Sequence, residues 1–147
     1  MIISVRDASE YFRGLLLLIA KDRSISDAEA ILMRRIGKAL GLEKDFCNNA
    51  IQEILENPFI GLEPPHFKTP ELAARFIKDG LTLALADDEP HDSEDAWLKS
   101  VALRNGLDED WLLRERRIAV VKRSTPDPHL EVDDLTVEYS RIDRGKE

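Results

Sequence analysis

Apolar residues recur at helical spacing along most of the chain, up to about Val121, and this pattern predicts an all-α fold. Ser26 and Thr69 are suited to cap the starts of the helices at 26–40 and 69–86, and Gly41 and Gly106 are suited to end the helices at 26–40 and 93–105. The predicted helices cover about residues 7–20, 26–40, 44–56, 69–86, 93–105 and 108–122.

The pattern changes after residue 123. Residues 124–147 form an acidic arm in which Leu135, Val137 and Tyr139 alternate with polar residues. This alternation favours a short strand, while the terminal position and the charge are equally compatible with disorder. We therefore expect one compact helical domain over residues 1–123, followed by an arm that is strand-like or flexible.

The helical part repeats itself. When the sequence is laid on itself with residue 7 on residue 72, the stretch 7–55 aligns with 72–120 without a gap, and 56–71 is left as a connector. We call this alignment the repeat register. Nine aligned pairs are identical, against roughly three expected from ordinary composition. We expect two pseudo-repeated three-helix units that pack on each other about a pseudo-twofold axis.

Acidic residues recur at one place in both units, the turn between the first and second helix. In the first unit, Ser26 and Glu29 have the spacing of a capping box, which explains the carboxylate structurally. The second turn holds five carboxylates and an imidazole between Asp87 and Glu94, more than capping uses. Such a cluster favours an oxygen-ligand cation, namely Ca²⁺, Mg²⁺ or Mn²⁺, with a transition metal at the imidazole as the alternative. The candidate metal ligands are Asp22, Glu29, Asp87, Asp88, His91, Asp92 and Glu94.

Composition limits the classes of function. The chain has 21 basic and 29 acidic residues and a net charge of −8, which disfavours nucleic acid as a partner. Its longest apolar run, residues 15–20, is too short to insert into a membrane, and its single cysteine fits the cytoplasm. The sequence carries no phosphate loop, nucleophile elbow or zinc spacing, so we expect no enzyme.

Four residues on apolar stripes are expected in the core. Cys47 is predicted to be a small buried residue. Phe46, Trp97 and Trp111 are predicted to be more than half buried.

The repeated motifs resemble those of the tellurite-resistance TerB-like superfamily over about residues 7–122. The motifs are Ala20-Lys21-Asp22, Ile25 to Glu29, and Leu40-Gly41-Leu42, echoed by Asp87, Glu94 and Gly106-Leu107. The resemblance implies a cytoplasmic all-α domain of stress and chemical-defence systems, with acidic surface residues implicated in divalent-metal binding. It also implies interaction modules beside chaperone-like or membrane-associated partners.

Two functions follow as expectations. The first is a weak divalent-metal binder that uses the acidic turns. The alternative is a protein-interaction module without metal. A protein partner is then expected, and that partner could be a second copy of the chain in a homodimer.

Overall fold

The computed structural model describes residues 1–20, 25–56, 63–86, 92–122 and 129–138, and these residues form six α-helices. The helices are α1 (Val5–Ile19), α2 (Asp27–Ala39), α3 (Lys44–Glu56), α4 (Pro70–Ala84), α5 (Asp92–Arg104) and α6 (Glu109–Lys122). The remaining elements are β1 (Ile2–Ile3), the 3-10 helix η1 (Glu131–Asp134) and β2 (Thr136–Val137). The predicted all-α class is confirmed, and each predicted helix lies within two residues of its expected bounds.

The predicted caps explain these bounds. The Ser26 hydroxyl accepts a hydrogen bond from the Glu29 N–H at 3.1 Å. The Thr69 hydroxyl accepts one from the Leu72 N–H at 3.2 Å, one residue before Pro70 opens α4. Gly41 and Gly106 have φ angles of 73° and 74°, which residues with a side chain rarely adopt. Local chemistry therefore fixes where these helices start and stop.

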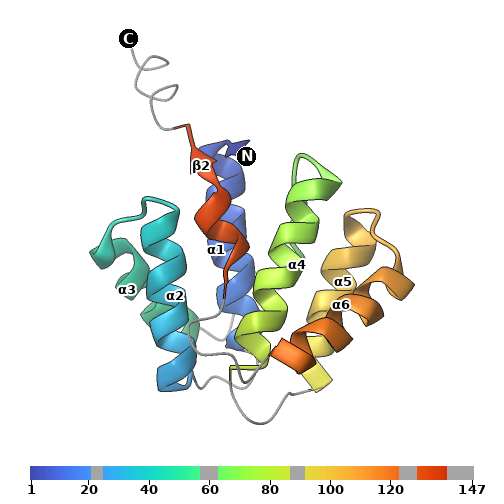
Figure 1. Cartoon of the computed structure of the whole chain (residues 1–147). Coiled ribbons are helices and arrows are strands. Elements are labelled where there is room, and N and C mark those ends of the chain that lie inside the picture. Colours follow the sequence, from blue (N-terminus) through green and yellow to red (C-terminus); the bar gives the residue numbers. More distant parts are fainter. Residues whose placement is uncertain (21–24, 57–62, 87–91, 123–128, 139–147) are drawn as a thin grey trace.

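Helices α1 and α4 lie in the middle of the molecule, with α2 and α3 on one side and α5 and α6 on the other (Figure 1). The two central helices approach closely because Gly14 of α1 has no side chain. A Cβ atom at Gly14 would lie 2.8 Å from Cε2 of Phe76 on α4. The Phe76 ring also packs edge-on against the ring of Tyr11, with 5.4 Å between centroids. The core is thus centred on the α1–α4 contact.

The helix bounds follow the repeat register. Laid out in this register, both ends of α1 fall on the ends of α4, and both ends of α2 fall on the ends of α5. The first residue of α3 likewise falls on the first residue of α6. Whether the two units superpose about an axis stays a prediction.

Residues 129–138, which we call the C-terminal segment, pack on the helical body. The segment passes between α2 and α4 and contacts both through η1 (Figure 1). Strand β2 pairs in parallel with β1, with Ile2 opposite Thr136 and Ile3 opposite Val137. The side chains of Leu130, Val132 and Leu135 are buried. The described part of the arm is therefore joined to the N-terminal end of the chain, while residues 124–128 and 139–147 lie outside the described residues.

The core predictions are confirmed except at Phe46. Trp97 is only 4% exposed, Trp111 is partly buried and Cys47 is buried. Phe46 is 51% exposed, because its ring lies at the edge of the core, 6.4 Å from the ring of Phe12 between centroids. Helix α3 buries Cys47 in its place.

Cys47 lies directly against α2. A Cβ atom at Gly37 would be 2.5 Å from the Cys47 sulfur, so Gly37 leaves the space that the thiol fills. None of the helices in the described ranges has the length and apolar character required to cross a membrane.

Candidate functional site

Two of the predicted metal ligands have described side chains, and both are buried. Glu29 is the third residue of α2, and its carboxylate accepts a hydrogen bond from the Ser26 N–H at 2.9 Å. Glu94 is buried near the start of α5. The capping explanation of Glu29 is confirmed, and one of its carboxylate oxygens is held by the cap.

The side chains of the other five candidates lie outside what the structure describes. Asp92 is the first residue of α5. Asp22, Asp87, Asp88 and His91 lie outside the described residues. A metal site at the acidic turns therefore stays a prediction.

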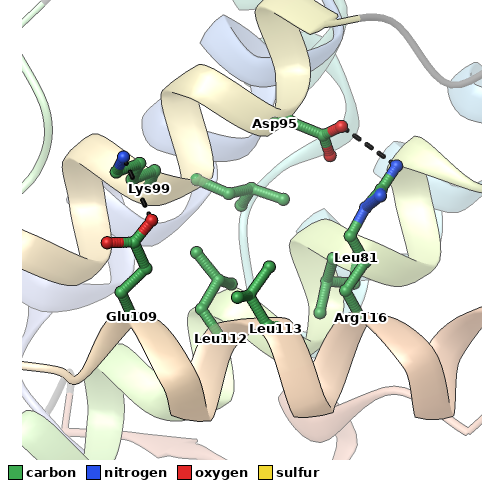
Figure 2. Close-up of a pocket in the computed structure, with 8 residues that line it drawn as sticks. Leu81, Asp95, Lys99, Glu109, Leu112, Leu113 and Arg116 are labelled. Carbon is green, nitrogen blue, oxygen red and sulfur yellow. Dashed lines mark ion pairs between the residues drawn. The ribbon is translucent and has the colours of Figure 1, made fainter.

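A small pocket between α4, α5 and α6 is the first candidate site that the sequence did not indicate. Its volume is about 150 Å³, and its apolar lining consists of Leu81, Leu98, Leu112 and Leu113. Two ion pairs join α5 to α6 at its edge, as Figure 2 shows. Lys99 contacts Glu109 at 3.1 Å, and Arg116 contacts Asp95 at 3.0 Å. Drug-sized ligands usually occupy about 300–1,000 Å³, so this pocket fits a single side chain better.

The exposed face of α6 continues from this pocket. It carries four large apolar side chains, one of which, Val121, is 80% exposed. Basic side chains are exposed between them. We call this set the α6 strip; it consists of Leu113, Arg114, Arg117, Ile118, Val120, Val121 and Lys122. An apolar face of this kind on a folded protein is typical of an interaction surface.

A buried carboxylate holds the C-terminal segment to the core. Asp79, on the buried side of α4, accepts hydrogen bonds from the Tyr11 hydroxyl at 2.6 Å and from the N–H groups of Glu131 and Val132 at 2.6 and 3.0 Å. Burial raises the pKa of Asp79 to about 6, although these hydrogen bonds act in the opposite direction. Burial, followed by the charge of Asp79, raises the pKa of Tyr11 well above its ordinary value. The arrangement fastens a chain segment, which is a structural role.

One group of possible metal ligands lies on the C-terminal segment. The nearest ligand atoms of His129, Glu131 and Asp134 are all within 4.8 Å of one another. The His129 imidazole is 2.9 Å from the Glu131 carboxylate, which also lies 3.9 Å from the basic groups of Arg75 and Lys78. These three residues were not among the ligands predicted from the sequence, because they stand in an arm whose turn could not be foreseen.

Comparison of the chain with protein-family models, with curated proteins and with solved structures finds no match. The likeness to TerB-like domains therefore rests on the sequence motifs alone.

The ionisation of Asp79 gives a testable pH dependence. Its folded-state pKa of about 6 exceeds the ordinary value of 3.8, so the stability from this group is complete below pH 3.8 and is lost as the pH rises through 6. We expect the difference in unfolding free energy between the native protein and Asp79→Asn to fall by about 2 kcal/mol from pH 4 to pH 7. Urea unfolding of both proteins measures this difference, in which the other titrating groups cancel. A difference that grows with pH would contradict the assignment.

Proposed function

We propose that this chain is a TerB-like interaction domain of a stress-response system, acting without catalysis and docking a protein partner on the α6 strip and the adjoining pocket. The two halves are taken as pseudo-repeats of three helices, supported by helix bounds that coincide in the repeat register. The cytoplasmic location stays a prediction from the single cysteine.

One observation carries the proposal, a difference between α6 and α3 at positions that align in the repeat register. Exposed positions on α3 hold the polar residues Asn48 and Glu53. The aligned positions on α6 are also exposed but hold Leu113 and Ile118, and one residue beyond the aligned stretches Glu56 of α3 corresponds to the exposed Val121 of α6. Burying one such aliphatic side chain is worth about 1.5–3 kcal/mol, and α6 leaves four large apolar side chains exposed, whereas α3 leaves one, Phe46. A partner that covers α6 would recover it.

The test is binding of an amphipathic helical peptide with leucines on one face and glutamines elsewhere. We expect this peptide to shift the amide resonances of α6 and of the pocket residues. The double variant Ile118→Gln/Val121→Gln should lose most of that binding while melting within a few degrees of the native protein, because exposed substitutions change stability by only about 0.5 kcal/mol.

A matched control distinguishes specific binding at α6 from nonspecific binding to exposed apolar side chains. Ile31 on α2 and Leu103 on α5 are also exposed, and Ile31→Gln/Leu103→Gln removes the same amount of apolar character elsewhere. The control should bind the peptide like the native protein. Equal loss of binding in both double variants would count against a specific surface on α6.

Divalent-cation binding is a second candidate function, favoured by the closeness of His129, Glu131 and Asp134. An imidazole and two carboxylates suit Mn²⁺ better than Ca²⁺, which prefers oxygen ligands only. Against it stand Arg75 and Lys78, which already offset the charge of Glu131.

Melting in the presence of cations tests this candidate. Millimolar Mn²⁺ should raise the melting temperature by a few degrees, since a cation at ten times its dissociation constant adds about 1.4 kcal/mol. His129→Gln/Asp134→Asn should remove the increase if the ligands lie on the C-terminal segment. Asp87→Asn/Asp88→Asn should remove it if they lie at the acidic turn. If no cation raised the melting temperature, protein interaction would be the only proposed function that remains.

A further inference from the structure

We propose that the α6 strip and its pocket dock an acidic amphipathic helix of a partner protein. This inference rests on the proposed function and specifies the chemistry of the partner.

The charge of the α6 strip favours an acidic partner. Its three charged residues, Arg114, Arg117 and Lys122, are all basic and exposed, whereas the whole chain carries a net charge of −8. On α3, the positions aligned with Arg114 and Arg117 hold the neutral residues Asn49 and Gln52. On this helix face the three basic residues outnumber the exposed carboxylate of Asp110, which lies one turn before Arg114.

The arginines of the α6 strip are available to a partner. Lys99 and Arg116, the basic residues at the pocket, are already paired with Glu109 and Asp95. In the described part of the chain, Arg114 and Arg117 form no ion pair. Carboxylates of a partner could pair with them without first breaking an internal contact, which favours complementary binding and fast association.

The shape of the surface suits a helix. Leu113 and Val120 are seven positions apart and so lie on one side of α6, which at Leu113 borders the pocket. Arg114, Arg117 and Val121 are three and four positions apart, so they form a second row beside Leu113 and Val120 on the same face of α6. A helix laid along α6 would place an apolar residue in the pocket and acidic residues beside the arginines, as in helix-in-groove recognition. Helix α6 is about 21 Å long at 1.5 Å per residue, which matches a partner helix of about four turns.

A protein helix fits this surface better than an anionic membrane. A bilayer surface faces the molecule over a wide area, and the net charge of the chain is −8. Anionic lipid headgroups would be repelled by this charge. A peptide helix can instead place single carboxylates opposite the arginines.

Three peptides of about 18 residues test the inference, each with the same leucines on one face and with Glu, Gln or Lys at the other positions. Calorimetric titration of the full chain should give the tightest binding for the Glu peptide, about tenfold tighter than for the Gln peptide, and weakest binding for the Lys peptide. Added salt should reduce the difference between the Glu and Gln peptides, because these charges are exposed.

Charge-reversal variants supply the control. Arg114→Glu/Arg117→Glu should reverse the order of the three peptides. Arg34→Glu/Lys38→Glu changes the net charge equally on α2 and should keep the native order.

Each other result has a defined meaning. Equal binding of all three peptides would overturn the acidic partner but leave the proposed interaction surface intact. No binding by any peptide would overturn the proposed function itself. Binding to phosphatidylglycerol vesicles without binding to the Glu peptide would overturn the inference in favour of a membrane surface. A native dimer that Ile118→Gln/Val121→Gln disperses would replace it with self-association.

Discussion

Replacing Trp97 by alanine should lower the free energy of unfolding by about 3–5 kcal/mol. The indole is buried between α5 and α1, and its N–H donates a hydrogen bond to the Gly14 carbonyl at 3.0 Å. The substitution would leave a cavity beside the close α1–α4 contact and would remove the hydrogen bond between α5 and α1. Urea unfolding followed by far-ultraviolet circular dichroism measures the loss.

Trp111 is the matched control, because it is the other tryptophan and is only partly buried. Trp111→Ala should lower the unfolding free energy by about 1–2 kcal/mol. Equal losses for the two variants would contradict the burial of Trp97 described above.

Replacing Leu130 by alanine should lower the unfolding free energy by about 2–5 kcal/mol. Leu130 is fully buried at the start of the C-terminal segment, one residue before the Asp79 hydrogen bonds begin. Weaker docking should also make this segment more susceptible to limited proteolysis. Both effects can be measured on one preparation.

Leu103→Ala serves as the control for Leu130→Ala, because Leu103 is exposed. Its effect should stay within about 0.5 kcal/mol. If Leu130→Ala were equally mild and left proteolysis unchanged, the segment would not be docked in solution.

The helices could be predicted from the sequence because their signals are local. Capping residues such as Ser26 and Thr69 act on an N–H group three positions away, and apolar spacing needs only one or two turns. The role of Asp79 could not be predicted in this way. Its backbone partner Glu131 is 52 residues away, and only the charge itself, on an apolar stripe with Phe76 and Ile77, indicated something unusual.

The same difference between local signals and long-range contacts decides which candidate sites could be predicted from the sequence. Glu29 is recognisable as a cap from a four-residue pattern, and the structure places it in one. Exposure of Ile118 and Val121 could not be foreseen, because helical spacing predicts an apolar face without telling whether another element covers it. Proximity of His129 to Asp134 depends on η1, a single short turn.

Because Cys47 is buried, its reaction with a thiol reagent can be used to measure the separation of α3 from α2 in the native protein. The chain has one thiol, packed against Gly37, and burial raises its pKa, so little reactive thiolate is present at neutral pH. A disulfide reagent can reach the sulfur only when α3 separates from α2. The rate of thiol modification under native conditions therefore measures the opening of α3 away from α2. The measurement needs no substitution and no attached dye.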